Sequence, residues 1–309
     1  MKTATLKPAG PGDSGLVEVL EYGLHGRPAW ADLDWRPNLR HVEIEGRRVN
    51  FVELGDHAAP AVILIHGLSG CWQNWLENIQ ALAADFHVIA PDLPGFGESE
   101  LPIEPVSIHG YGRTIVALMD ALGVDRANLI GNSMGGQTAA QAALDAPERV
   151  DKLVLVSAAG YSTSAAPAFL PRGAGGLALL LPRLAARRET IVKRPGLRKL
   201  FLSVVAAHPD KLRSEIAFEL IGGAGKLGFV AATQAIFAHD FRENLGGIAC
   251  PTLIVWGEKD RLVGARDADR FAGKIPGSTK MILADTGHLA MVERPAWFNA
   301  TVRDYLLAS

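Results

Sequence analysis

The segment Gly131-Asn132-Ser133-Met134-Gly135 follows an apolar, strand-like run and precedes an Ala-rich helical pattern. It matches G-x-S-x-G in the strand–turn–helix context that this motif requires. A strand that turns abruptly into a helix strains its middle residue, and side chains at Gly131 and Gly135 would collide with that turn. The alternative is an ordinary strand–helix turn. Motif and position together predict that Ser133 projects above a sheet edge as a nucleophile.

Strand-like and helical patterns alternate on both sides of this motif. A hairpin is predicted over 41–54, where apolar and polar residues alternate around Gly46. Strand–helix alternation implies parallel pairing, and strands that are apolar throughout imply helices on both faces of the sheet. The sequence thus predicts an α/β fold with a mostly parallel sheet. The further strand-like runs lie at 61–65, 86–90, 127–131, 153–157, 252–256 and 279–283, and the helical patterns at 72–84, 107–122, 134–145 and 295–307.

The rhythm changes between residues 161 and 247, where Leu/Ala/Arg-rich helical stretches are broken by several prolines. Such a segment is typical of an insertion rather than of a further strand–helix repeat. We therefore expect 161–247 to form a helical cap over a core made of 41–160 and 248–309. Residues 1–40 form an N-terminal extension in this division.

Charge and composition exclude several classes of partner. The chain has 31 Lys and Arg against 33 Asp and Glu, so no strong field favours nucleic acid or an anionic membrane. No apolar run approaches the roughly 20 residues that a spanning helix needs. The start of the chain has no apolar stretch of signal-peptide length. We expect a cytoplasmic enzyme without membrane insertion that acts on a small molecule, and its oligomeric state is left open.

The two cysteines, Cys71 and Cys250, lie far apart and show no C-x-x-C or Cys/His ligand spacing. A disulfide framework or a zinc site is not expected on that basis. No metal and no organic cofactor is predicted.

A serine hydroxyl is a weak nucleophile at neutral pH and needs a positioned base. Among nine histidines, His288 follows the last strand-like run in a loop that can return over the sheet. The alternative interpretation is that His288 is an ordinary histidine in a surface loop. His66 is the rival base, although Gly67 beside it suggests a structural hydrogen bond near the oxyanion loop. The chain order of serine, acid and histidine favours His288.

The acid must hold the imidazole in the correct tautomer and stabilise its cation. Asp260 follows an apolar strand-like run and lies between Ser133 and His288 in chain order. Glu258 is the nearest competitor, and either carboxylate could instead be a solvated turn residue. No carboxylate follows the preceding strand, which strengthens the prediction of Asp260.

Negative charge that develops on a substrate oxygen needs donors fixed in advance. They are expected to be the backbone N–H after the nucleophile and one from the first long loop. Met134 and Leu68 occupy those places, and the glycines around Leu68 supply a flexible backbone.

These segments together resemble the α/β-hydrolase superfamily, in its capped serine hydrolases of the esterase and carbon–carbon hydrolase type. The resemblance covers roughly residues 41 to 307. Ser133 argues against the dehalogenases and epoxide hydrolases of the superfamily, which use aspartate at this turn. The matching segments are His66-Gly67, Asp92-Leu93-Pro94-Gly95-Phe96-Gly97-Glu98-Ser99, Gly131-Asn132-Ser133-Met134-Gly135-Gly136, Trp256-Gly257-Glu258-Lys259-Asp260 and Gly287-His288.

The resemblance implies an eight-stranded sheet, a cap inserted after the sixth strand, and a triad of Ser133, Asp260 and His288. We expect hydrolysis of a carboxylic ester with a small to medium apolar acyl group or an aromatic group, and water as the second substrate. The alternatives are a carbon–carbon bond hydrolase of ring-fission products, a lactonase or perhydrolase, and a ligand receptor without turnover. The residues predicted to line the pocket are Leu68, Phe169, Leu170, Phe237 and Leu289.

Overall fold

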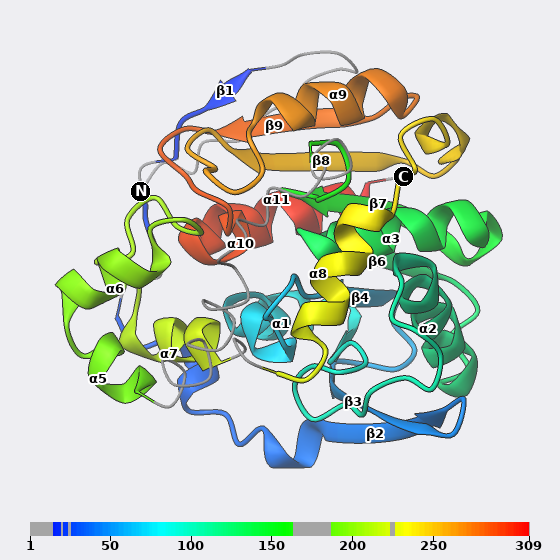
Figure 1. Cartoon of the computed structure of the whole chain (residues 1–309), viewed down its shortest axis with the longest axis horizontal. Coiled ribbons are helices and arrows are strands. Elements are labelled where there is room, and N and C mark those ends of the chain that lie inside the picture. Colours follow the sequence, from blue (N-terminus) through cyan, green and yellow to red (C-terminus); the bar gives the residue numbers. More distant parts are fainter. Residues whose placement is uncertain (1–14, 20, 24–25, 163–186, 223–225, 309) are drawn as a thin grey trace.

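The computed structural model describes residues 15–19, 21–23, 26–162, 187–222 and 226–308. A nine-stranded sheet crosses the molecule in the order β1-β9-β8-β7-β6-β4-β5-β3-β2 (Figure 1). In this order, every adjacent pair in the run β1-β9-β8-β7-β6-β4-β5 is parallel. Strand β3 pairs antiparallel with β5 and with β2. The predicted α/β fold with a mostly parallel sheet is confirmed.

The eight expected strands are all found, and β1 adds a ninth. This strand precedes the hairpin of β2 and β3 in the chain and pairs in parallel with β9. Two residues are too few to show an alternating pattern, so the sequence gives no sign of β1. The strands are β1 (Leu16–Val17), β2 (Leu39–Ile44), β3 (Arg47–Leu54), β4 (Ala61–Ile65), β5 (His87–Pro91), β6 (Ala127–Asn132), β7 (Val150–Val156), β8 (Thr252–Gly257) and β9 (Thr279–Leu283).

Helices cover both faces of the sheet, and the alternation of side chains along each strand divides the core into two apolar layers. In β4, Ile63 and Ile65 belong to one layer, and Val62 and Leu64 belong to the other. The first layer contains α2 (Ile108–Ala121), α3 (Met134–Asp145) and α9 (Arg266–Lys274). The second contains α1 (Leu76–Leu82), α10 (Ala290–Glu293) and α11 (Pro295–Leu307).

Four helices are described between β7 and β8, the sixth and seventh of the expected strands. Buried side chains of α5 and α7 join the α1 layer, whereas those of α8 join the α2 layer. Figure 1 accordingly shows α5, α6 and α7 grouped at the left of the molecule and α8 crossing in front of the strands. These helices are α5 (Arg188–Val192), α6 (Pro195–Leu202), α7 (Ser214–Gly222) and α8 (Phe229–Ala238).

Short 3₁₀ turns complete the described backbone: η1 (Ala29–Ala31), η2 (Arg36–Asn38), η3 (Trp72–Trp75), η4 (Pro147–Arg149) and η5 (Leu245–Gly247).

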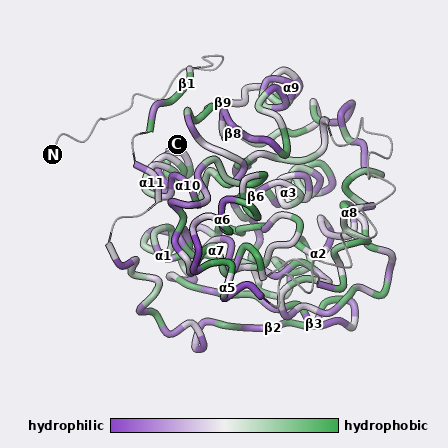
Figure 2. The backbone as a smooth tube through the Cα atoms, turned by 60° about the vertical axis from the view of Figure 1, so that its left-hand side comes forward, coloured by the Kyte–Doolittle hydropathy of each residue, from purple (hydrophilic) through white to green (hydrophobic). Residues whose placement is uncertain are grey.

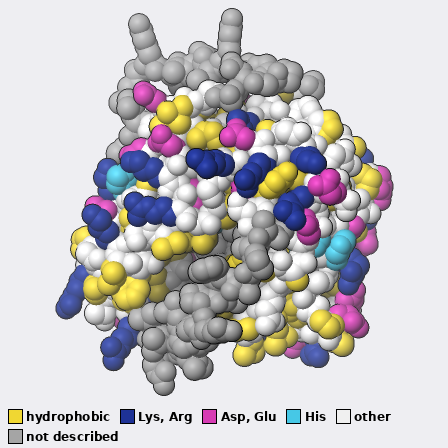
Figure 3. All heavy atoms as spheres, turned by 45° about the horizontal axis from the view of Figure 1, so that its top comes forward, with side chains coloured by type: hydrophobic (Ala, Val, Ile, Leu, Met, Phe, Trp, Pro, Cys, Tyr) yellow, Lys and Arg dark blue, Asp and Glu magenta, His cyan; other side chains and the backbone are white. Residues whose placement is uncertain are grey.

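Hydropathy follows this layering. In Figure 2 the peripheral α9 is largely hydrophilic, whereas the central strand β4 is apolar throughout. On the face drawn in Figure 3, Lys and Arg side chains are interspersed with Asp and Glu side chains, as expected of a chain with almost balanced charge. Within the described ranges, no helix is both long and apolar enough to cross a bilayer.

Candidate active site

The turn between β6 and α3 holds Ser133 in a strained backbone conformation. Its φ of 56° and ψ of −117° lie outside the regions that most residues adopt. A Cβ atom on Gly131 would lie 2.2 Å from the carbonyl oxygen of Gly135, and one on Gly135 would lie 2.1 Å from that of Ile65. Both glycines are therefore required for this turn, which lifts Ser133 off the end of β6.

Backbone and side-chain hydrogen bonds fix the turn in place. The Ser133 amide donates to Val156 O at 3.0 Å, and the Ala159 amide donates to Ser133 O at 3.0 Å. The side-chain amide of Asn132 donates to Val156 O at 3.1 Å and to His288 O at 3.2 Å. Asn132 thus joins the Ser133 turn directly to the residue that carries the predicted base.

His288 and Asp260 form a buried pair. The His288 Nδ1 atom lies 2.8 Å from Asp260 Oδ2, and the side chains are 3% and 0% exposed. The other carboxylate oxygen of Asp260 accepts the backbone amides of Leu262 and Val263, each at 2.9 Å. An ionised carboxylate only accepts hydrogen bonds, so Nδ1 carries the proton and Nε2 is available as a base.

The competing acid and base have other partners. Glu258 is exposed, and its carboxylate accepts the backbone amide of Asp285 at 3.0 Å. The His66 Nδ1 atom donates to Gly67 O at 2.8 Å, and its Nε2 atom accepts the Leu93 amide at 2.9 Å. Burial lowers the pKa of His66, so this imidazole is neutral. With both nitrogens bonded to backbone, His66 supports the loop beside Ser133.

The first long loop approaches Ser133 closely. A Cβ atom on Gly67 would lie 3.1 Å from the Cβ atom of Ser133. The following turn is closed by the Gly70 amide, which donates to Gly67 O at 3.0 Å, and Ser69 has a positive φ of 62°. Leu68 lies in this turn. Met134 is the first residue of α3, where a backbone N–H has no partner within the helix.

A buried carboxylate that the sequence analysis did not single out holds the His288 loop. Glu293 Oε1 accepts the amides of Gly287 at 3.0 Å and Leu289 at 3.2 Å, the two residues that flank His288. Its Oε2 atom accepts the Ala207 amide and the Tyr22 hydroxyl, both at 2.8 Å. Burial raises the pKa of the Glu293 carboxyl. The one feature of the sequence that could have indicated this role is the position of Glu293, an acidic residue directly after the apolar run 289–292.

The predicted pocket residues are distributed unevenly. Leu68 is half-buried against the α2 layer, and Leu289 is buried in the α1 layer. Phe237 on α8 is 39% exposed. Phe169 and Leu170 lie outside the described residues.

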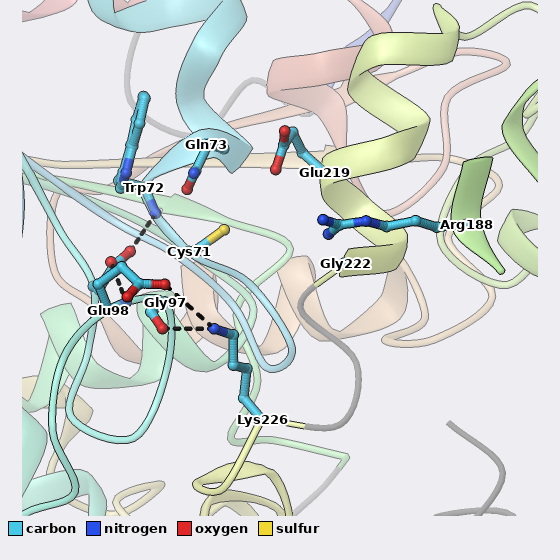
Figure 4. Close-up of a pocket in the computed structure, with 10 residues that line it drawn as sticks. Cys71, Trp72, Gln73, Gly97, Glu98, Arg188, Glu219, Gly222 and Lys226 are labelled. Atoms are coloured by element: carbon cyan, nitrogen blue, oxygen red, sulfur yellow. Dashed lines mark hydrogen bonds and ion pairs between the residues drawn. The ribbon is translucent and has the colours of Figure 1, made fainter. Parts of the chain in front are cut away.

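A cavity of about 260 Å³ lies between the core and the helices that follow β7 (Figure 4). It has a polar lining that includes none of the predicted pocket residues. Lys226 closes one side, where its ammonium donates to Gly97 O at 2.7 Å. Arg188 and Glu219 face the cavity from α5 and α7, and burial raises the pKa of Glu219. The lining residues are Cys71, Trp72, Gln73, Asp92, Gly97, Glu98, Arg188, Glu219, Gly222 and Lys226.

Comparison with known proteins gives the family. The sequence profile described as alpha/beta hydrolase fold matches residues 60–191 and 216–295. This chain belongs to the α/β-hydrolase fold family. The resemblance inferred from the motifs is thereby confirmed.

Relatives of this hydrolase have diverse names. It is 32% identical to the 2-hydroxy-6-oxononadienedioate/2-hydroxy-6-oxononatrienedioate hydrolase of Klebsiella pneumoniae, with 86% of this chain and 94% of the relative covered. It is 31% identical to the dihydrolipoyllysine-residue acetyltransferase component of the acetoin cleaving system of Pseudomonas putida, with 89% and 71% covered. A solved N-acyl homoserine lactone degrading enzyme is 28% identical with a TM-score of 0.70, covering 86% of this chain and all of the other.

Proposed function

We propose that this hydrolase cleaves a carboxylic ester, with a small to medium apolar acyl group or an aromatic group, through an acyl-enzyme on Ser133. The observation that carries the proposal is the buried His288–Asp260 pair, which Asn132 joins to the strained Ser133 turn. Nucleophilic acyl transfer requires a serine and a histidine base whose tautomer is fixed by an acid. The strained Ser133 turn, the Asp260–His288 pair and the Asn132 link between them support this role.

In the first half of the reaction, His288 Nε2 takes the proton of the Ser133 hydroxyl as its oxygen attacks the ester carbonyl carbon. The backbone amides of Leu68 and Met134 donate to the oxyanion. Collapse of this intermediate breaks the ester bond, and His288 gives its proton to the departing alcohol. In the second half, His288 deprotonates a water that attacks the acyl group, and the acid leaves as Ser133 regains its proton. Asp260 stabilises the imidazolium in both halves.

We further propose that residues 161–247, of which 163–186 and 223–225 lie outside the described residues, act as a cap. Two described contacts support this role. The His288 amide donates to Val205 O at 3.0 Å, and residues of α5 and α7 line the cavity over the core. A cap held against the base in this way can exclude water from the acyl-enzyme until the alcohol has left.

Hydrolysis of a carbon–carbon bond is the second candidate. The Klebsiella relative is named for a dienedioate substrate, which carries two carboxylates. In this chain the cavity between the core and the helices that follow β7 is lined by two cations, Arg188 and Lys226. A guanidinium or ammonium group can bind a substrate carboxylate there, although the carboxylates of Asp92, Glu98 and Glu219 line the same cavity. The same triad could then act on a keto-acid.

A substrate panel tests the two candidates. The purified chain is assayed with p-nitrophenyl esters graded from acetate to palmitate, with lactones and with a dienoic keto-acid. The ester proposal expects p-nitrophenol release for short to medium acyl groups. Turnover of the keto-acid with no ester turnover would favour the second candidate. No turnover of any substrate would contradict both.

A serine replacement tests the nucleophile. Ser133→Ala is expected to abolish turnover with the fold retained, since no other group in the turn can form the acyl-enzyme. Ser157→Ala is the matched control, because Ser157 is a buried serine directly after the neighbouring strand β7. Unchanged ester hydrolysis by Ser133→Ala would overturn the assignment.

A further inference from the structure

A cluster of two histidines and a glutamate lies at the edge of the sheet opposite the Ser133 turn. It consists of Glu53 at the end of β3, His57 in the turn after it, and His87 at the start of β5. One ligand atom from each residue lies within 4.8 Å of those of the other two. We propose that Glu53, His57 and His87 bind a Zn²⁺ ion or a similar late first-row divalent cation.

The distances within this cluster suit a zinc ion. Glu53 Oε1 lies 2.8 Å from His87 Nε2 and 3.7 Å from His57 Nδ1. Tetrahedral zinc with bonds of 2.0 to 2.1 Å holds its ligand atoms about 3.4 Å apart. The two observed distances bracket that value, and the third, between the two histidine nitrogens, is at most 4.8 Å. The ligand atoms therefore have to shift, the histidine nitrogens toward each other in particular, to hold the ion. Imidazole and carboxylate are among the ligands that zinc prefers in proteins.

The backbone holds the three ligands from three directions. Glu53 pairs with Ile89 across β3 and β5, and His87 pairs with Ala61 across β5 and β4. The turn that carries His57 is closed by the Ala59 amide, which donates to Asp56 O at 2.9 Å. The ligand positions are therefore set before any ion binds.

Gly55 brings this turn onto β5. A Cβ atom at this position would lie 2.1 Å from the carbonyl oxygen of Phe86, and its φ is 102°. Only glycine permits so close an approach in that conformation. His57 is thereby placed beside His87, and the two rings have their centroids 4.4 Å apart.

The exposure of the three side chains also fits a bound ion. The side chains of His87 and Glu53 are 4% and 11% exposed, whereas His57 is 73% exposed. Water can therefore reach the ion as a fourth ligand. Arg40 Nε lies 3.9 Å from Glu53 Oε2. That contact orients the carboxylate so that its other oxygen faces the two imidazoles, as outer-shell partners do at metal sites.

The site would be structural rather than part of the triad. His87 and Ala61 begin β5 and β4, whereas Ser133 follows the carboxyl end of β6. A bound ion would tie the turn after β3 to β5 and stabilise the folded state by binding it selectively. The prediction of no metal site rested on cysteine spacing, which does not bear on ligands brought together by β3 and β5.

Calorimetric titration of the chelator-treated full chain with ZnCl₂ tests this proposal. We expect one ion per chain and a thermal midpoint that rises with zinc. The variants His57→Ala, His87→Gln and Glu53→Gln should each weaken binding at least about tenfold. His57→Ala changes an exposed side chain, so this variant tests the site even if His87→Gln fails to fold.

His109→Gln is the matched control, because His109 also pairs with a carboxylate, that of Asp145 at 3.1 Å, and should leave zinc binding unchanged. Absence of binding to the wild-type chain would overturn the proposal. Equal binding by His57→Ala and the wild type would overturn it as well.

Discussion

Two histidine–aspartate pairs meet the same short loop, residues 285–288, and they differ in almost everything but distance. His288–Asp260 and His208–Asp285 both have a nitrogen 2.8 Å from a carboxylate oxygen. The first pair is 3% and 0% exposed, and the second is 29% and 46% exposed. Asp260 has backbone amides as its other partners, whereas Asp285 also accepts a hydrogen bond from Lys259.

This difference shows that a hydrogen bond between a histidine and an aspartate is not enough to make the histidine a catalytic base. Water and Lys259 compete for Asp285, so its effect on His208 is screened. Asp260 has no such competitor among the described residues, and its histidine is joined by Asn132 to a strained serine. Burial, a fixed second oxygen and the neighbouring nucleophile distinguish the proposed catalytic pair.

Replacement of the two aspartates should give the largest difference between the two pairs. Asp260→Asn is expected to lower kcat about 10⁴-fold, since the amide favours the wrong histidine tautomer. Asp285→Asn is the matched control and should change kcat less than about threefold, because its partner His208 takes no part in the reaction. Steady-state kinetics with the preferred p-nitrophenyl ester measures both. Equal losses in the two variants would contradict the distinction.

Glu293→Gln should give the next largest effect. Gln presents an NH₂ group where one carboxylate oxygen accepts backbone amides, so the residues flanking His288 would shift. A displacement of about 1 Å can cost about 10²-fold in rate. We expect kcat to fall by that order with KM nearly unchanged.

Glu77→Gln is the control for Glu293→Gln. Glu77 is also a buried carboxylate with a raised pKa, but its side chain bonds Trp30 rather than the His288 loop. A similar loss of kcat in both variants would show a general effect of buried charge. If the Glu293→Gln enzyme is as active as the wild type, Glu293 does not position His288.

Asn132→Ala should lower kcat by a smaller factor. The variant removes the hydrogen bond from the Ser133 turn to His288 O, and the expected loss is roughly tenfold in kcat. Asn128→Ala serves as its control, because Asn128 lies on the same strand and donates to Ala61 O at 3.1 Å, away from His288. The prediction fails if both variants lose the same activity.

The smallest effect concerns stability and pH. The hydrogen bond from Lys259 lowers the pKa of Asp285 from 3.8 to about 2. A lowered carboxyl pKa stabilises the folded state above pH 3.8, and that contribution is lost as pH falls toward 2. Because Asp285 is 46% exposed, solvent screening limits the contribution to about 0.5 kcal/mol.

Asp285→Asn provides the test, since asparagine tolerates the positive φ of 50° at this position. Urea unfolding should show a lower free energy of unfolding for the variant at pH 7 and a vanishing difference near pH 2. A difference that grows as pH falls would contradict this account.

The parts of the site that could be predicted from sequence are those whose cause is local. The Ser133 turn depends on glycines within two residues of the serine, and these are visible in the chain. Asp260 and His288 follow from chain order once the turn is recognised. Strands that are apolar throughout predicted the two-sided sheet for the same reason, because burial on both faces leaves its mark within each strand.

The features of the fold and the site that could not be predicted depend on contacts between segments far apart in sequence. Tyr22 precedes β2 and Ala207 lies between β7 and β8, and no local pattern encodes the contact of both residues with Glu293. Glu53 and His87 are likewise brought together by strand pairing. β1 is too short to show a period. Long-range contacts of this kind become visible only in the folded chain.

In the proposed mechanism Ser133 carries the acyl group, and mass spectrometry of the trapped intermediate can locate that group. The enzyme is mixed with a p-nitrophenyl ester, quenched in acid during the burst and digested. We predict the acyl mass on the peptide that contains Ser133, and none on the Ser133→Ala protein. An acyl group on another residue, or turnover in the Ser133→Ala protein, would contradict the claim.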